Sequence, residues 1–402
     1  MSETMLPEIV LNWIDGAEKG ASDGALFNNL SPATGKLLCQ AVGSRQIDVD
    51  KAVASARKAY PAWSGMTPVQ RGDILMAVAG ALRQNADTMA AIVATETGMA
   101  PSAALGETGG AIAQAEFMAG EGRRLYGRTT TSAVPHKYAM TVRHPLGVAG
   151  LIIAANTPIA NVAWKVFPAL ICGNTAVLKA AEDTPATAWY FGKLAKEAGL
   201  PPGVLNIVQG LGEEAGAPLV AHPDIAVISF TGSTAVGRQI AETAGRRLAK
   251  VSLELGGKNP LVVCDDADLE NAAKWVLLSA FSNAGQRCAA GSRIIVFDAV
   301  YDRFRDMLIE KTKQLKVGPT DMDDIGPVIN ETQLNNMTAA VEQARQEGAR
   351  ILVGGSRMTD PEHADGFYMA PTLVENADPR AGISTREVFG PITCLYRVKD
   401  FE

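Results

Sequence analysis

Residues 148–255 alternate short apolar runs with helical segments, and this alternation constrains the fold more than any other feature of the chain. The apolar runs are GLIIAA, TAVLKA, VLNIVQG, AVISFTG and VSLELGG, and segments such as PATAWYFGKLAKEAG lie between them. Strands that alternate with helices form a parallel sheet with helices on both faces. The sequence therefore predicts an α/β fold.

A second alternating series begins near Asn259 and contains NPLVVC, SRIIVF and ARILVGG. Residues 47–127 are alanine-rich with apolar residues at helical spacing, which predicts a run of helices. Residues 128–145 are polar and β-prone, so we expect a projecting arm there. The chain is thus divided into one domain over 1–127 and 146–255, the arm over 128–145, and a second α/β domain over 256–402.

Composition excludes several classes of function. The net charge is −6 and the 37 Lys and Arg residues are scattered, which argues against a nucleic-acid partner. The longest apolar run, around GVAGLIIAA, is about half a membrane span, and the N-terminus is acidic where a signal peptide is basic. The five cysteines lack a CxxC pair and the four histidines lack metal-ligand spacing. We expect a cytoplasmic protein with no membrane partner and no metal.

Two glycine-containing turns are candidates for a nucleotide site. Gly210, Gly212 and Gly216 lie between a predicted strand and a helix, where backbone N–H groups can approach a phosphate. Their GxGxxxG spacing differs from the usual GxGxxG, and a plain tight turn is the alternative. In the next unit a strand ends at Gly232 and a helix opens at Ser233, a good N-cap residue, so the pair of turns favours the nucleotide.

Charged residues at two strand ends have a structural and a functional interpretation. Lys179 and Glu182 are either solvated surface charges or a pair that holds the hydroxyls of an adenosine ribose. Glu254 lies between Leu253 and Leu255, so strand alternation turns it away from both leucines. A carboxylate at the end of a buried strand suits a general base.

Cys288 lies in FSNAGQRCAAGSR, and an inert buried thiol is the ordinary interpretation of such a cysteine. Small and polar residues surround it, however, and Arg287 beside it favours a thiolate. The strand SRIIVF begins just after it. No histidine is placed to act as its base, which disfavours a papain-like pair.

Four motifs together resemble those of the NAD(P)-dependent aldehyde dehydrogenase superfamily: SFTGSTAVG at 229–237, LELGGKNP at 253–260, GQRCAAGSR at 285–293 and EVFGPI at 387–392. The resemblance runs from about residue 10 to the end of the chain. It implies a Rossmann-type cofactor domain, an α/β catalytic domain and a small oligomerisation arm.

The resemblance also implies roles for single residues. Cys288 would attack the aldehyde carbonyl, Asn156 and the Cys288 backbone N–H would stabilise the oxyanion, and Glu254 would activate the water that hydrolyses the thioester. The implied cofactor residues are Lys179, Glu182, Gly212, Gly216, Gly232, Ser233, Glu387 and Phe389. A carboxylate at 182 would repel a 2′-phosphate, so NAD is preferred to NADP.

The chain departs from the family in the segment around Asn156, which reads AANTP in place of an aromatic-rich sequence. The positions that would line the aldehyde tunnel are Thr157, Ala160, Asn161, Trp164 and Arg287. One cation and two neutral polar side chains in this set favour an aldehyde with a polar or anionic end, such as a semialdehyde.

The sequence stops at Glu402, where family members continue, so we expect a C-terminally incomplete catalytic domain and a homodimer or homotetramer in the intact protein. One alternative is a catalytically impaired truncated member that binds a nucleotide or a subunit. Another is a dehydrogenase that passes the acyl group to coenzyme A, which Glu254 disfavours because such branches generally lack this base.

Overall fold

The computed structural model describes residues 6–401 and divides the chain into two compact units. The N-terminal unit contains Met1–Asn29, Leu38–Val93 and Leu105–Glu254, and the C-terminal unit contains Leu30–Leu37, Ala94–Ala104 and Leu255–Glu402. The main division falls one residue before the boundary that the sequence suggests. The two short segments 30–37 and 94–104, which the sequence-based division assigned to the first domain, cluster with the C-terminal unit.

The N-terminal unit is built on a seven-stranded sheet with the order β12-β11-β8-β9-β10-β2-β3. Four of these strands pair in parallel: β8 (Val148–Ile152), β9 (Thr175–Lys179), β10 (Leu205–Val208) and β11 (Ile225–Gly232). β2 (Asn12–Ile14) pairs antiparallel with β10 and with β3 (Ala17–Lys19). Every residue of β8, β9 and β10 is buried, as continuous apolar runs in a covered parallel sheet require. The predicted α/β class is confirmed.

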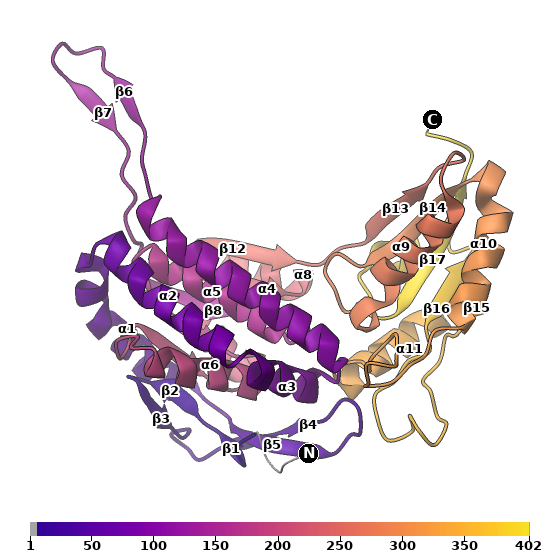
Figure 1. Ribbon diagram of the computed structural model, residues 1–402, viewed down its shortest axis with the longest axis horizontal. Helices are drawn as coiled ribbons and strands as arrows, with labels where there is room; N and C mark the ends of the chain where they lie inside the picture. The colour runs from indigo at the N-terminus through magenta and orange to yellow at the C-terminus, as the bar shows by residue number, and fades with distance from the viewer. Residues whose placement is uncertain (1–5, 402) are drawn as a thin grey trace. The chain divides into compact units, whose positions relative to one another are not determined.

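Helices cover this sheet (Figure 1). The predicted run over 47–127 comprises α1 (Gln46–Gly65), α2 (Pro68–Gln84), α3 (Ala86–Thr97) and α4 (Pro101–Gly120), followed by the short η1 (Glu121–Arg123). The helices between the strands are α5 (Pro158–Ile171), α6 (Pro185–Glu197), α7 (Ala217–Ala221) and α8 (Thr234–Gly245). Both α1 and α5 pack against β9, and α2 packs against α5 and α6. The start of α2 is fixed by a capping box, in which Thr67 and Gln70 bond to each other's backbone N–H.

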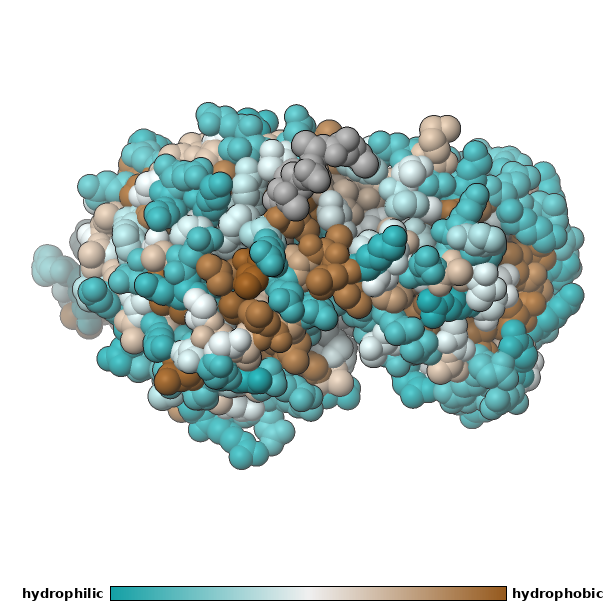
Figure 2. Space-filling view, turned by 90° about the horizontal axis from the view of Figure 1, so that it is seen from below, coloured by the Kyte–Doolittle hydropathy of each residue, from teal (hydrophilic) through white to brown (hydrophobic). Residues whose placement is uncertain are grey.

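A small three-stranded sheet, in the order β1-β5-β4, lies at the N-terminus. It consists of β1 (Ile9–Val10), β4 (Leu26–Leu30) and β5 (Leu37–Val42). Its side chains Ile9, Leu26 and Leu37 are exposed. Figure 2, which views the protein from below, shows hydrophobic side chains gathered among hydrophilic ones on this face. Contiguous apolar surface of this kind is typical of an interaction face.

The predicted arm is a two-stranded hairpin. β6 (Thr129–Thr131) and β7 (Tyr138–Met140) pair antiparallel and project beyond the helices of their unit (Figure 1). Tyr138 and Met140 are 80% and 67% exposed. A single hairpin is marginal in water, so this one gains little stability from contacts of its own.

The C-terminal unit carries a five-stranded sheet with the order β13-β14-β17-β16-β15. β13 (Asn259–Val263), β14 (Gly291–Phe297), β17 (Ile392–Val398) and β16 (Thr372–Glu375) are parallel, and β15 (Arg350–Val353) is antiparallel. The helices are α9 (Leu269–Phe281), α10 (Asp298–Lys313), α11 (Glu331–Gln346) and α12 (Gly382–Thr385). The core between α9, α10 and the sheet includes Phe281, Ile294 and Phe304.

β12 (Lys250–Leu255) differs from its predicted environment. The sequence suggested a buried strand, but β12 is the outermost strand of the seven, and Glu254 on it is exposed. The leucines that flank Glu254 are half-buried, as the expected alternation requires. Within residues 6–401, the structure holds no helix that is both long and apolar enough to cross a membrane.

Candidate functional site

The loop that carries Cys288 follows α9 in the C-terminal unit and leads into β14. Its first part is η3 (Ser282–Gly285), where three successive residues are left-handed: Asn283 has φ 53°, Ala284 has φ 52° and Gly285 has φ 67°. This conformation is disfavoured for residues other than glycine. A Cβ on Gly285 would lie 2.0 Å from the carbonyl oxygen of Gly390, so glycine is required there. The Cys288 side chain beyond this turn is exposed.

The left-handed turn is anchored by the buried amide of Gln286. Its Nε2 donates to the carbonyl oxygens of Asn283 at 3.2 Å and Pro327 at 3.3 Å. Its Oε1 accepts the Ile329 N–H at 2.9 Å. The turn is therefore tied both to itself and to a neighbouring segment.

The other flank of Cys288 is held by Asn259, the first residue of β13. The Nδ2 of Asn259 donates to the carbonyl oxygen of Cys288 at 2.7 Å and to that of Ala290 at 3.1 Å. Neither Asn259 nor Gln286 was among the residues predicted from the sequence. Both lie inside the recognised motifs, LELGGKNP and GQRCAAGSR, but an uncharged amide gives no signal of its own in a single sequence.

Arg287 precedes Cys288 and is exposed. Its guanidinium donates to the Ser282 hydroxyl at 3.0 Å. It also lines a recess of ≈ 20 Å³, room for about one water molecule, together with Lys258, Glu387 and Phe389. Two cations and one carboxylate thus surround a small opening in the same unit as Cys288.

Glu387 and Lys258 in this recess are both perturbed by burial. Burial raises the pKa of Glu387, while the Gly257 N–H and the Lys258 charge act in the opposite direction. Burial lowers the pKa of Lys258, and the charge of Glu387 opposes that change. A Cβ on Gly256 would lie 1.9 Å from a Glu387 carboxylate oxygen, so glycine at this position leaves room for the carboxylate.

Asn156 lies in the N-terminal unit, in the turn between β8 and α5, and its Oδ1 is buried. The side chain of Thr157 at the start of α5 does not cap the helix. Glu107 of α4 does so instead: its Oε1 accepts the Ala160 N–H at 3.1 Å, and its carboxylate also accepts from Ile159. A carboxylate at a helix N-terminus satisfies free N–H groups and matches the helix dipole.

Burial raises the pKa of Glu107 to about 7, although the two backbone hydrogen bonds oppose the rise. Its second oxygen, Oε2, is buried without a hydrogen-bond partner. Glu107, with a pKa near neutral pH, thus bonds to the first turn of the helix that follows Asn156. The sequence offered no sign of this role, because GETGG lies in a helix whose spacing suggests only structure.

Lys165 is a second buried ionisable group that sequence reasoning missed. It lies on α5 and is 4% exposed, and its ammonium donates to the Ser229 hydroxyl of β11 at 3.0 Å. Burial lowers the pKa of Lys165 to about 8, and the negative charge of Glu254 opposes this change. Its sequence signal was weak but present: a lysine in the apolar segment ANVAWKVFPALI has no solvated face to occupy.

The predicted cofactor residues of the N-terminal unit follow the ends of parallel strands. Lys179, the last residue of β9, is buried and forms an ion pair with Glu182. Gly212 and Gly216 bound η2 (Gly212–Gly216), a single π-helical turn after β10. Gly232 ends β11, and the Ser233 hydroxyl accepts the Val236 N–H at 3.3 Å as the N-cap of α8. The carboxyl end of a parallel sheet is the usual place for a nucleotide.

The predicted tunnel residues Thr157, Ala160, Asn161 and Trp164 lie at or near the start of α5. Trp164 is 52% exposed, whereas Asn161 is buried and donates to the backbone and hydroxyl oxygens of Thr157 at 2.9 and 3.1 Å. Arg287 and Cys288 belong to the other unit. That these residues meet around one substrate stays a prediction.

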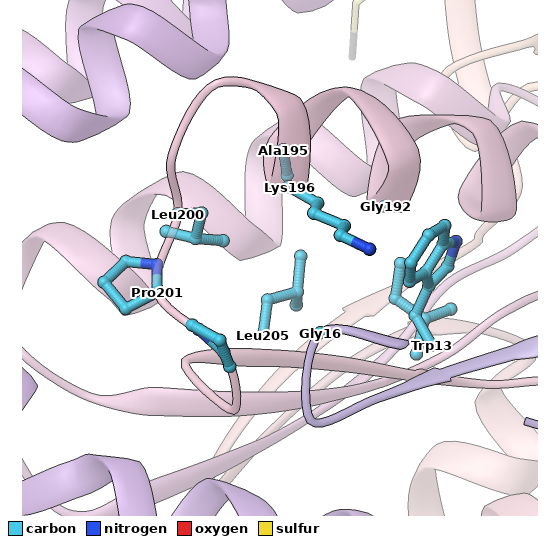
Figure 3. A pocket seen from close by; sticks show the side chains of 10 residues that line it. Trp13, Gly16, Gly192, Ala195, Lys196, Leu200, Pro201 and Leu205 are labelled. Carbon is cyan, nitrogen blue, oxygen red and sulfur yellow. The ribbon is translucent and has the colours of Figure 1, made fainter. Parts of the chain in front are cut away.

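A different recess lies beside the edge of the seven-stranded sheet, near Trp13 and Lys196 (Figure 3). Its volume is ≈ 20 Å³, enough for about one water molecule, and the Lys196 ammonium lies 5.4 Å from the centre of a Trp13 ring. This recess contains none of the residues that carry the predicted chemistry. Within residues 6–401, no three His, Cys, Asp or Glu side chains gather as a metal site.

The fold and the cysteine loop define a two-unit α/β protein, and comparison with known proteins identifies its family. The model of the aldehyde dehydrogenase family matches residues 19–402. The chain belongs to the aldehyde dehydrogenase family, and it is an oxidoreductase. The resemblance seen in its four motifs is thereby confirmed.

Relatives match most of the chain. It is 38% identical to alpha-ketoglutaric semialdehyde dehydrogenase of Bacillus subtilis over 98% of this chain and 81% of that protein. It is 40% identical to an aldehyde dehydrogenase of Alternaria alternata over 94% of this chain and 76% of that protein. Betaine aldehyde dehydrogenase from Staphylococcus aureus in complex with NAD+ has a TM-score of 0.95 and 30% identity, covering 97% of this chain and 78% of that one.

Proposed function

We propose that this aldehyde dehydrogenase oxidises an aldehyde with a polar or anionic end to the carboxylic acid, with NAD as its cofactor. The observation that carries the proposal is the exposed thiol of Cys288 at the end of a left-handed loop whose backbone is bonded on both flanks. An inert cysteine needs neither exposure nor a disfavoured backbone.

The proposed reaction begins when the Cys288 thiolate attacks the carbonyl carbon and a C–S bond forms. The electron pair of the C=O bond moves to oxygen, where the Asn156 amide and the Cys288 backbone N–H donate hydrogen bonds to it. The carbonyl re-forms as a hydride leaves the carbon, which yields a thioester. NAD, when bound, supplies the acceptor for this hydride.

Water then completes the oxidation. Glu254 takes a proton from water, the water oxygen attacks the thioester carbon, and the C–S bond breaks to return the thiolate and release the acid. The exposure of Glu254 on an edge strand suits a group that must meet water. Lys165 lies within electrostatic reach of Glu254, and its ammonium attracts the carboxylate that must meet water.

The residues present fit a dinucleotide. The ion pair of Lys179 with Glu182 offers an ammonium and a carboxylate for two ribose hydroxyls, and Glu182 is 43% exposed on its side chain. The turns at Gly212, Gly216, Gly232 and Ser233 offer backbone N–H groups for the pyrophosphate. Glu387 and Phe389 would hold the nicotinamide ribose. The carboxylate at 182 favours NAD, as does the NAD+ bound to the related Staphylococcus aureus enzyme.

The choice of a semialdehyde is supported by charge. Arg287 directly precedes Cys288 and is exposed, so its guanidinium is free to pair with an anionic substrate end. Thr157, Asn161 and Trp164 are the further residues proposed to contact the substrate. The Bacillus subtilis relative is named for alpha-ketoglutaric semialdehyde, an aldehyde with an anionic end.

We also propose a homodimer or homotetramer, supported by the exposed apolar side chains of the hairpin arm and the small N-terminal sheet. A cytoplasmic location suits a catalytic thiol, because reducing compartments keep thiols free.

The test is NADH production by the purified chain over a panel of aromatic, aliphatic and acidic aldehydes. We expect turnover with the parent, highest kcat/KM with an acidic semialdehyde, and none with Cys288→Ala. Cys264→Ala, a change at a half-buried cysteine of the same unit, is the matched control. Arg287→Ala should lose more activity toward acidic semialdehydes than toward neutral aldehydes. Equal losses would overturn the substrate class, and no turnover by the parent with any aldehyde would overturn the function.

A further inference from the structure

We propose that Asn259 and Gln286 are positioning residues that clamp the Cys288 loop on both sides and fix the nucleophile for attack. The inference rests on the proposed role of Cys288 and extends it to two amides that touch neither the thiol nor the reacting atoms. Each amide bonds to backbone carbonyls, so its effect passes through the loop conformation.

The upstream clamp works against the natural preference of the backbone. Asn283 and Ala284 are left-handed, a conformation that non-glycine residues leave when nothing holds them. Gln286 closes this turn on itself by donating to the Asn283 carbonyl, and it bonds outward to residues 327 and 329. Because Gln286 is 3% exposed, water cannot readily replace these bonds.

The downstream clamp holds the backbone of Cys288 itself. The two N–H bonds of the Asn259 amide point to two carbonyls that flank residue 289, so a single planar group sets the orientation of both peptides. Asn259 is placed for this contact by the sheet, because it opens β13 and pairs with Gly291 of β14, just before the register shifts at Pro260. The Ala290 N–H also donates to the Arg287 carbonyl at 3.0 Å, which closes a turn around Cys288.

Asn259 holds the peptide that follows Cys288, and the Ala290 N–H holds the peptide that precedes it, so together they fix the direction of the Cys288 Cα–Cβ bond and of its backbone N–H. Attack on a carbonyl requires the sulfur and the oxyanion donor to be placed together, and a misplacement of about 1 Å can lower a rate by about a hundredfold. An amide that does only this should change kcat and leave cofactor affinity nearly unchanged.

The experiment compares Asn259→Ala, Asn259→Ser and Gln286→Met with the parent. Asn259→Ser retains one donor and serves as the partial rescue. Asn335→Ala, a change at an exposed position on α11 of the same unit, is the matched control. The readouts are kcat, the KM for NAD, hydrogen exchange of peptides covering residues 283–291, and the thermal midpoint.

We expect Asn259→Ala to lower kcat about tenfold or more, with the KM for NAD within about twofold of the parent. Exchange should become about fivefold faster in the loop and stay unchanged elsewhere. Asn259→Ser should fall between Asn259→Ala and the parent, and Gln286→Met should also speed exchange in the loop.

Unchanged kcat and loop exchange in Asn259→Ala would overturn the proposal. So would a fall in kcat that a loss of folded protein fully explains, since that shows a merely structural role. Hydrogen exchange of the loop can be measured without turnover, so it tests the role of the two amides even if the parent is inactive. Inactivity of the parent would overturn the proposed function instead.

Discussion

The ammonium of Lys165 donates a hydrogen bond of 3.0 Å to the hydroxyl of Ser229, and this bond joins α5 to β11. Lys165 is 4% exposed, and burial lowers its pKa from the usual 10.5 to about 8. Burying this amine therefore lowers the stability of the fold relative to an apolar side chain of similar size.

Replacing Lys165 with Met should stabilise the fold at pH 7 while slowing turnover. The folded pKa is lowered, so the stability contribution is present above pH 10.5 and is lost as the pH falls through about 8. The lowered pKa corresponds to a loss of about 3 kcal/mol in the free energy of unfolding at pH 7. The hydrogen bond to Ser229 offsets about 1 kcal/mol of that loss, and Lys165→Met removes both effects.

The measurement is the thermal midpoint and kcat of Lys165→Met across pH 7 to 10, with the exposed Lys58→Met as control. The gain in midpoint should be largest at pH 7 and shrink as the pH rises. A variant that melts lower than the parent at pH 7 would contradict the assigned desolvation of Lys165.

Glu107 should make the stability of the protein decline between pH 4.5 and about 7. Burial raises the pKa of Glu107 in the folded protein from 4.5 to about 7, so its contribution to the free energy of unfolding is complete below pH 4.5 and is lost as the pH rises through about 7. The free energy of unfolding changes by about 3 kcal/mol over this window. Glu107→Gln keeps the acceptor for the Ala160 N–H but cannot ionise.

Thermal midpoints of the parent and of Glu107→Gln over pH 4.5 to 8 test this directly. The parent should lose several degrees relative to the variant as the pH rises through this window. Glu116→Gln, a change at a half-buried carboxylate of the same helix that pairs with Arg83, is the control, and its difference from the parent should stay constant over this window. Parallel curves for parent and Glu107→Gln would show that Glu107 does not titrate there.

The features that the sequence predicted well share one physical origin. Runs of mostly apolar residues such as those of β8 and β9 are easily recognised because strands covered on both faces contain few polar side chains. Cys288 and Glu254 were proposed from the sequence because a thiol and a strand carboxylate are conspicuous in such surroundings, and their catalytic roles stay predictions. Asn259, Gln286 and Glu107 were not singled out, because their hydrogen bonds are to backbone atoms distant in sequence.

The burial of β12 was predicted wrongly for a related reason. The composition of VSLELGG resembles that of an inner strand, and only the strand order shows that β12 has one neighbour. The antiparallel strand β2 was also missed. Its three buried residues are too short a pattern to recognise, and its partner β10 is almost two hundred residues away along the chain.

Glu182 should set the preference between NAD and NADP. Its carboxylate pairs with Lys179 at the end of β9, and a 2′-phosphate placed there would meet a negative charge. Glu182→Ser should narrow the ratio of kcat/KM for NAD over NADP by about tenfold or more. The exposed Glu197→Gln on α6 is the control. If the ratio is unchanged in Glu182→Ser, the residue does not face the 2′ position.

Lys258 should support cofactor binding through Glu387. The two residues line the same recess, and the charge of each stabilises the ionised form of the other. Lys258→Met should raise the KM for NAD several-fold, because Glu387 then binds a proton more readily and loses its acceptor character. The exposed Lys274→Met on α9 is the control.

A double-mutant cycle isolates the Lys258 effect from simple repacking. Glu387→Gln alone should weaken NAD binding, and adding Lys258→Met to it should cause little further loss. Additive losses would mean that Lys258 acts on the cofactor independently of Glu387. NADH binding followed by fluorescence gives the same comparison without requiring turnover.

Glu254→Gln should separate the two halves of the reaction. The variant keeps Cys288 and Asn156, so the first oxidation still proceeds, but no carboxylate remains to deprotonate the water that releases the acid. We expect one equivalent of NADH per chain in a rapid burst, followed by a steady rate at least about a hundredfold below that of the parent. Stopped-flow absorbance of NADH measures both phases, and mass spectrometry should detect the acyl group on the Cys288 peptide.

Glu242→Gln, a change at an exposed position on α8, is the control and should behave as the parent does. A variant without a burst would place Glu254 before hydride departure, because a base needed only for hydrolysis cannot affect the first turnover.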